Sequence, residues 1–186
     1  MNRYLFIDRD GVINRDRPSY ITCWEEFEFL PGSLEALARL TTAGFSIIII
    51  TNQSAIGRKM MPPAELERIF AGMRRSVEAK GGYILDIFHC PHLPGDECDC
   101  RKPGTGLIRK ASGKYAINPA ETGFIGDSAK DILCARAAGC AFAVLVESGS
   151  HTAEAKTELI AQGIWPDHVA KDLAAAANWI ISNQTR

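Results

Sequence analysis

Four consecutive isoleucines, Ile47 to Ile50, constrain the fold more than any other feature of the chain. A β-branched run that is apolar at every position predicts a strand buried on both faces, as in the middle of a parallel sheet. Five apolar runs have strand length, namely Tyr4–Ile7, Ser46–Ile50, Ile84–His89, Gly123–Ile125 and Ala141–Val146. Helical patterns occupy Ser33–Ala43, Pro62–Lys80, Gly106–Tyr115, Ala129–Ala138, Thr152–Gln162 and Lys171–Ser182. This alternation predicts an α/β fold, a Rossmann-like doubly wound parallel sheet with helices on both faces.

The bulk properties favour one ordinary globular domain over residues 1–186. Hydrophobic residues make up 46% of the chain and charged residues 23%, and no repeat or linker divides it. The net charge of −1 gives no general attraction to nucleic acid or to a membrane surface. No apolar run reaches the roughly 18 residues that a membrane span needs. Since no signal peptide pattern is present, we expect a cytoplasmic protein with reduced cysteines, and without a coiled-coil repeat we expect a monomer.

Two aspartates follow directly on the first predicted strand. Asp8 and Asp10 are two residues apart, so in extended chain they project to the same side. Carboxylates that close repel each other unless a cation lies between them or one of them is protonated. Asp127, after another strand, could complete such a site, and oxygen ligands suit Mg²⁺. The alternatives are a solvated polar strand end for the first pair and a helix-capping role for Asp127 or Asp131.

Two further strand ends carry polar groups. The segment Thr51–Ser54 offers hydroxyl and amide groups that can donate hydrogen bonds to a phosphate, although polar strand ends are common. Lys102, after Arg101, could offset the charge of clustered aspartates and bind a phosphoryl oxygen, or the two could form a solvated basic pair. The glycine-rich loops that usually cradle nucleotide phosphates are absent from the sequence.

A cluster of cysteines and one histidine forms the most specific local pattern. Its members are Cys90, His92, Cys98 and Cys100. Three thiols and one imidazole within eleven residues fit a tetrahedral zinc site with no position left for water, which is typical of a structural zinc. We therefore predict a zinc-stabilised loop at about residues 89–106, with chance clustering of reduced cysteines as the alternative. His89 is excluded from the ligands because its side chain should point away from Cys90.

In combination, these motifs resemble the four motifs of the haloacid dehalogenase superfamily of phosphatases. The matching positions are Asp8-Arg9-Asp10-Gly11, Thr51-Asn52-Gln53, Lys102 and Gly126-Asp127 with Asp131. The cysteine loop narrows the resemblance to the zinc-loop group of that superfamily. The resemblance covers nearly the whole chain, and the short spacing between motifs leaves no room for a separate cap domain.

The resemblance implies a Mg²⁺-dependent phosphomonoesterase with a structural Zn²⁺. It makes Asp8 the nucleophile that forms an aspartyl-phosphate and Asp10 the acid and base. The implied Mg²⁺ ligands are Asp8, Asp10 and Asp127. Thr51 and Lys102 would hold the transferring phosphoryl group, and Asp131 would orient Lys102 or the water shell of the metal.

The implied substrate is a small phosphorylated sugar. Motif details favour the 7-phosphate of heptose 1,7-bisphosphate, on the route to lipopolysaccharide heptose, with Arg101 and Arg58 as candidates for the second phosphate. The compact cysteine loop, and Ser128 where many heptose enzymes carry lysine, keep histidinol phosphate of histidine biosynthesis as the alternative. The predicted substrate contacts are Asp16, Ser19, Tyr20, Asn52, Gln53, Ser54, Arg101 and Ser128.

Overall fold

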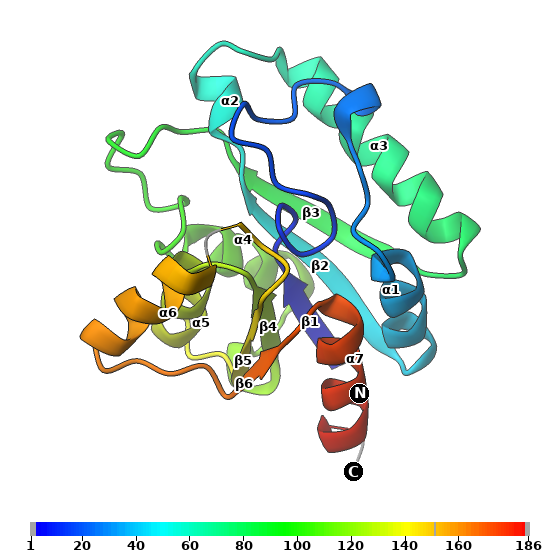
Figure 1. Ribbon diagram of the computed structural model, residues 1–186, viewed down its shortest axis with the longest axis vertical. Helices are drawn as coiled ribbons and strands as arrows, with labels where there is room; N and C mark the ends of the chain where they lie inside the picture. The colour runs from blue at the N-terminus through cyan, green and yellow to red at the C-terminus, as the bar shows by residue number, and fades with distance from the viewer. Residues whose placement is uncertain (1–2, 151, 185–186) are drawn as a thin grey trace.

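Six parallel strands form one sheet in the order β3-β2-β1-β4-β5-β6, in a computed structural model that describes residues 3–150 and 152–184 (Figure 1). The strands are β1 (Arg3–Ile7), β2 (Phe45–Asn52), β3 (Ile84–Cys90), β4 (Gly123–Gly126), β5 (Phe142–Val146) and β6 (His168–Ala170). The chain winds outward from β1 in both directions, so β1 lies at the switch point where open α/β sheets bind ligands.

Helices cover both faces of this sheet. They are α1 (Ser33–Thr42), α2 (Ser54–Gly57), α3 (Pro63–Ala79), α4 (Gly106–Tyr115), α5 (Ala129–Ala137), α6 (Thr152–Ala161) and α7 (Leu173–Gln184), with 3₁₀ turns η1 (Trp24–Glu26) and η2 (Pro119–Glu121). Helices α1, α3 and α7 contribute to one core, and α4, α5 and α6 contribute to the other (Figure 1). The doubly wound α/β fold is therefore confirmed.

The isoleucine run in β2 explains why two cores are needed. Ile47 and Ile49 belong to the core under α1, α3 and α7, whereas Ile48 and Ile50 belong to the core on the opposite face. Successive side chains of a strand point to opposite faces, so a run that is apolar throughout must be covered on both sides. All four isoleucines are fully buried.

Besides the two 3₁₀ turns, the structure adds one strand and one α-helix to the elements predicted from the sequence. Strand β6 has only three residues and lies at the sheet edge, and α2 is a single turn, so neither is long enough to produce a periodic pattern. The other strands and helices fall where they were predicted, with ends shifted by a few residues. Within the described residues, no helix has the length and hydrophobicity that crossing a membrane would require.

Candidate active site

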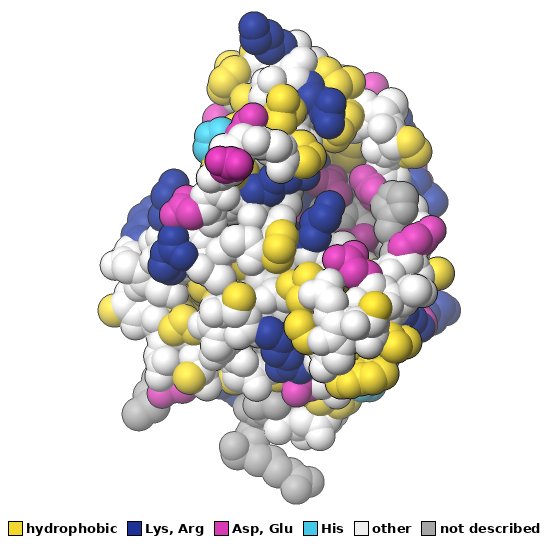
Figure 2. All heavy atoms as spheres, turned by 90° about the vertical axis from the view of Figure 1, so that its left-hand side faces the viewer, with side chains coloured by type: hydrophobic (Ala, Val, Ile, Leu, Met, Phe, Trp, Pro, Cys, Tyr) yellow, Lys and Arg dark blue, Asp and Glu magenta, His cyan; other side chains and the backbone are white. Residues whose placement is uncertain are grey.

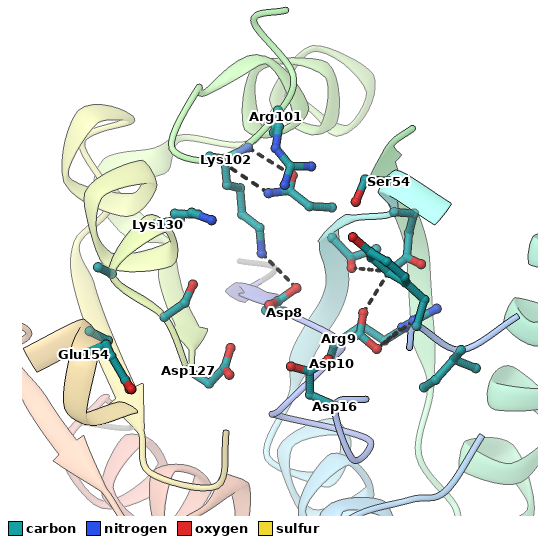
Figure 3. Close-up of a pocket in the computed structure, with 18 of the residues that line it drawn as sticks. Asp8, Arg9, Asp10, Asp16, Ser54, Arg101, Lys102, Asp127, Lys130 and Glu154 are labelled. Carbon is teal, nitrogen blue, oxygen red and sulfur yellow. Dashed lines mark hydrogen bonds and ion pairs between the residues drawn. The ribbon is translucent and has the colours of Figure 1, made fainter. Parts of the chain in front are cut away.

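A cleft of about 330 Å³ lies at the carboxyl ends of β1, β2 and β4 (Figure 3). The predicted site residues that line it are Asp8, Asp10, Asp16, Tyr20, Thr51, Asn52, Gln53, Ser54, Arg101, Lys102, Asp127 and Ser128. The other residues in its wall are Arg9, Ile21, Ala129, Lys130, Glu154, Ala155 and Glu158. Ser19 is exposed and does not line the cleft, and Asp131 is fully buried behind it.

Lys102 forms the charged centre of the cleft floor. Its ammonium group lies 2.8 Å from Oδ1 of Asp8 and 2.5 Å from Oδ1 of Asp131, and it donates a hydrogen bond to the Ile50 carbonyl at 2.9 Å. Burial by itself lowers the pKa of Lys102, but the carboxylates of Asp131 and Asp8 outweigh burial and raise it. The lysine is therefore held as a cation between two acidic groups, rather than exposed to solvent.

Three carboxylates gather around this cation. Asp8, Asp127 and Asp131 each offer an oxygen within 4.8 Å of the others. Burial, aided by the neighbouring carboxylates, raises the pKa of Asp8 to about 7 against the opposing effect of Lys102, and raises that of Asp127 to about 9. Crowded carboxylates with raised pKa values need a counter-charge to stay ionised, and a hard divalent cation supplies one. The donor set thus fits Mg²⁺.

Asp131 has a different task from the other two. Its Oδ2 accepts hydrogen bonds from the backbone N–H of Ser128 at 3.0 Å and from the Ser128 hydroxyl at 2.6 Å, which caps helix α5. Its Oδ1 faces Lys102. Both oxygens of Asp131 are therefore engaged, one by the start of α5 and the other by Lys102. Its predicted role, in orienting Lys102 or the water shell of the metal, stays a prediction. Substrate contact by Ser128 stays a prediction.

Asp10 is held by a ring of donors. Arg9 donates from Nε at 3.1 Å and Nη2 at 2.6 Å, Asn14 donates from Nδ2 at 2.9 Å, and Gln53 donates from Nε2 at 2.8 Å. Burial alone would raise the pKa of Asp10, but these donors together lower it. Sequence reasoning missed Arg9 and Asn14. A charged residue inside the aspartate motif resembles a solvated side chain, yet Arg9 is only 1% exposed.

The polar residues after β2 hold their neighbours in place. Thr51 is fully buried and accepts a hydrogen bond from the Gln53 amide at 2.9 Å. Asn52 makes two bonds with the backbone of Lys102, accepting from its N–H at 3.0 Å and donating to its carbonyl at 3.3 Å. Asn52 thereby joins the end of β2 to the loop that carries Lys102. Its contact with substrate, like that of Gln53, stays a prediction.

The four predicted zinc ligands lie together in the loop between β3 and α4, and their donor atoms are all within 4.8 Å of one another. The Sγ atom of Cys90 lies 3.7 Å from Sγ of Cys98 and 3.5 Å from Nδ1 of His92. Zn–S bonds of about 2.3 Å and Zn–N bonds of about 2.0 Å in a tetrahedron imply S···S and S···N separations of about 3.8 and 3.5 Å. The Sγ atom of Cys100 lies closer, 3.1 Å from both Sγ of Cys90 and Nδ1 of His92. The types of the four donors and their grouping are compatible with zinc. His89 instead packs its ring against Phe70, with centroids 5.6 Å apart.

Charges are divided between the two sides of the cleft. In the view of Figure 3, Arg101 and Lys130 lie above Asp8, whereas Glu154 and Asp16 lie below it. On the face that carries the zinc loop and α6, acidic and basic side chains surround the hollow (Figure 2). Lys130 and Glu154 were not predicted from the sequence, because each lies on a helix where a surface charge is usual. Arg58 is exposed outside the cleft, with its guanidinium 5.6 Å from the Tyr20 ring centre.

Known proteins are similar to this chain in sequence and in fold. A family model described as HAD-hydrolase-like matches residues 99–176. The chain is 38% identical over 181 residues to the D-glycero-beta-D-manno-heptose-1,7-bisphosphate 7-phosphatase of Bordetella bronchiseptica, covering 96% of this chain and 98% of that protein. It is 44% identical over 147 residues to the protein of the same name from Pseudomonas putida, covering 79% and 83%.

A solved structure agrees with these sequence matches. The crystal structure of D,D-heptose 1,7-bisphosphate phosphatase from B. bronchiseptica, complexed with magnesium and phosphate, superposes with a TM-score of 0.88. The match has 37% sequence identity and covers 97% of this chain and 98% of the other. Since relatives at 38% and 44% identity match most of its length, the chain belongs to the haloacid dehalogenase-like family of heptose-bisphosphate phosphatases and is a hydrolase of phosphate monoesters.

Proposed function

We propose that the protein removes the 7-phosphate of D-glycero-D-manno-heptose 1,7-bisphosphate in a Mg²⁺-dependent reaction through an aspartyl-phosphate on Asp8. The observation that carries this proposal is the position of Asp8. Its carboxylate is nearly buried at the switch point of the sheet, paired with Lys102 and adjacent to Asp127. The names of the relatives at 38% and 44% identity supply the substrate.

The first step transfers the phosphoryl group from the sugar to the enzyme. Mg²⁺, held by Asp8, Asp127 and the Asp10 backbone carbonyl, would offset the repulsion between the anionic nucleophile and the phosphate. An oxygen of Asp8 forms a bond to phosphorus while the bond to the C7 oxygen breaks, and Asp10 delivers a proton to that oxygen. Lys102 and Thr51 hold the phosphoryl oxygens during the transfer.

The second step hydrolyses the aspartyl-phosphate. Asp10 removes a proton from water, the water oxygen bonds to phosphorus, and the bond to Asp8 breaks to release phosphate. Because Arg9, Asn14 and Gln53 lower the pKa of Asp10, it rests as the carboxylate that this step needs. The proton that Asp10 delivers in the first step then comes from the substrate. The phosphate of the substrate has its second pKa near 6, so it is partly monoanionic at neutral pH and can pass this proton to Asp10.

The divided cleft supports a bisphosphate substrate. Arg101 and Lys130 can pair with a second phosphate, and Asp16 and Glu154 can accept hydrogen bonds from sugar hydroxyls. The same acidic side favours histidinol phosphate as a second candidate, since its leaving group carries an amine that these carboxylates could bind.

The reduced cysteine cluster and a phosphorylated sugar substrate both suit the cytoplasm.

The test measures phosphate release from both anomers of heptose 1,7-bisphosphate and from histidinol phosphate, with Mg²⁺ and equal amounts of enzyme. We expect kcat/KM to favour one heptose anomer by at least about 100-fold, equivalent to about 2.7 kcal/mol in transition-state binding. A preference for histidinol phosphate would overturn the substrate assignment and leave the phosphatase chemistry in place. The Asp8→Asn variant should fold and release no phosphate, so turnover by a clean preparation would contradict the nucleophile.

A further inference from the structure

We propose that Gly149 is a positioning residue that, with Gly11, sets the orientation of the Asp127 carboxylate by packing rather than by hydrogen bonds. The inference rests on the proposed Mg²⁺ site. It concerns the loop after β5, residues 147–150, which none of the sequence motifs includes.

The carboxylates near Lys102 differ in how they are held in place. Asp10 and Asp131 each accept several hydrogen bonds. Among residues 3–150 and 152–184, no N–H or O–H group donates a hydrogen bond to the side chain of Asp127. Its oxygens are thus left for a cation, and something other than hydrogen bonding must fix the side chain, which is only 6% exposed.

Two glycines provide that constraint by contact. Asp127 follows β4, and the strands on either side of β4 are β1 and β5. Gly11 lies in the loop after β1, and a Cβ atom there would be 2.2 Å from Oδ2 of Asp127. Gly149 lies in the loop after β5, and its Cβ atom would be 1.9 Å from the same oxygen. Figure 3 shows the resulting place of Asp127 in the cleft, with Asp8 between it and Asp10.

Rotation of the Asp127 side chain would not make room for alanine at position 149. The added Cβ atom would also lie 2.7 Å from Cβ of Asp127, and that atom does not move when the side chain rotates. Real Cβ contacts are essentially never shorter than 3.0 Å, so the backbone of one loop must shift. A shift of the loop that carries Asp127 moves the carboxylate relative to Asp8, and a shift of the Gly149 loop removes the contact that holds the carboxylate in place.

Hydrogen bonds fix the loop that carries Gly149. The hydroxyl of Ser148 donates to the Gly11 carbonyl at 2.7 Å and so joins the two glycine loops directly. The hydroxyl of Thr152 donates to the Gly149 carbonyl at 3.1 Å, which connects the loop to the start of α6. The hydroxyl of Ser150 donates to Asp16 at 3.2 Å. These hydrogen bonds therefore hold the loop in contact with Asp127.

Gly149→Ala is the sharper of the two possible substitutions. Gly11 has φ +77°, so alanine there would also strain the backbone, whereas Gly149 does not adopt such a conformation. Gly113→Ala is the matched control, because a Cβ atom at Gly113 on α4 would meet nothing within 4 Å.

The experiment measures Mg²⁺ binding to the substrate-free full chain by isothermal titration calorimetry, with zinc content and circular dichroism recorded for every variant. We expect Gly149→Ala to raise the Kd for Mg²⁺ by about 10- to 100-fold, as loss of outer-shell support typically does. Gly113→Ala should bind as the wild type does. A folded Gly149→Ala variant with wild-type affinity would overturn the inference.

A second variant decides the case if Gly149→Ala does not fold. Ser148→Ala removes only the bond between the two loops, and we expect a smaller rise in Kd, whereas an unchanged Kd would overturn the inference. A wild-type chain that binds Mg²⁺ without hydrolysing heptose bisphosphate would contradict only the proposed substrate. A wild-type chain that binds no divalent cation would remove the metal site and this inference together.

Discussion

At the scale of single residues, charge compensation around Lys102 organises the site. A buried ammonium group between Asp8 and Asp131 is stable only as part of the set, because each isolated charge would be costly to keep from water. Asp131 caps α5 with its other oxygen, so the same residue couples helix geometry to the position of the cation.

Lys102→Met should destabilise the protein strongly. It leaves Asp8 and Asp131 buried without their partner, and breaking a buried pair typically costs about 3–5 kcal/mol. Urea unfolding without added divalent cation measures the loss in the free energy of unfolding. The double variant Lys102→Met/Asp131→Asn should recover part of it, because one unpaired carboxylate is removed. Lys110→Met, at an exposed position on α4, is the control, and an equally small effect of both lysine variants would contradict the prediction.

Stabilisation by Mg²⁺ should grow with pH. In the metal-free protein the pKa values of Asp8 and Asp127, about 7 and about 9, lie above the ordinary value of 3.8. The folded state therefore binds more protons than the unfolded state between about pH 4 and pH 9, and these two groups lower stability as pH rises through that window. A cation relieves the repulsion of the ionised forms. The increase in Tm on adding Mg²⁺ should be larger at pH 8 than at pH 5.5, and equal increases would contradict the assigned carboxylates.

At the scale of elements, the zinc loop and the loops after the strands bring the side chains together. Cys100 directly precedes Arg101 and Lys102, and Arg101 donates a hydrogen bond to the His92 carbonyl at 3.1 Å. A metal ion bound by the cysteine cluster would therefore hold these two cations in place through only one or two residues. Asn52 fixes the same segment from the side of β2.

Loss of zinc should therefore impair activity more than folding. Cys98→Ser removes one ligand from the partly exposed side of the cluster. Cys98 only borders the core under α4, α5 and α6, to which Cys90 and Cys100 belong, and the core on the opposite face lies outside the loop. We expect lower zinc content and a fall in kcat/KM of about tenfold or more, with little change in far-UV circular dichroism. Cys23→Ser, at a cysteine outside the cluster, should retain zinc and activity. Full activity of zinc-free Cys98→Ser would contradict a positioning role for the loop.

At the scale of the whole molecule, both cores share one sheet. Alternate isoleucines of β2 belong to opposite cores. Detaching either layer of helices would therefore expose one apolar face of this strand to water. No second sheet is present among the described residues. The cleft at the edge of this sheet is open to solvent on the side of α6 and the zinc loop (Figure 2).

The chain should unfold as a single domain. Tryptophan fluorescence and far-UV circular dichroism, followed during urea unfolding of the zinc-loaded protein, should give coincident single transitions. The tryptophans report unequally on the two halves, since Trp24 packs near α3, Trp179 lies on α7 and Trp165 follows α6. Separate transitions would contradict the single-domain prediction.

Sedimentation in the same buffer should give the mass of one chain, as the expected monomer requires.

Patterns in the sequence were enough to predict the sheet, its buried central strand, the aspartates at the strand ends and a group of four potential metal ligands. These features are visible because each depends on residues close together in the chain, through strand and helix periodicity or ligand spacing. Only the tertiary structure showed that Arg9 and Asn14 hold Asp10, that Asn52 bonds to the backbone of Lys102, and that Lys130 and Glu154 face the cleft.

The same contrast between local sequence and tertiary packing explains why a role for Gly149 was not predicted. Its contact with Asp127 joins two loops that are 22 residues apart in the chain and adjacent only because β4 and β5 pair in parallel. Nothing in the local sequence marks a glycine whose missing side chain makes room for a carboxylate. Residue type and spacing identify the chemical groups of a site, whereas strand order and register decide which of them meet, and that decision depends on packing across the whole sheet.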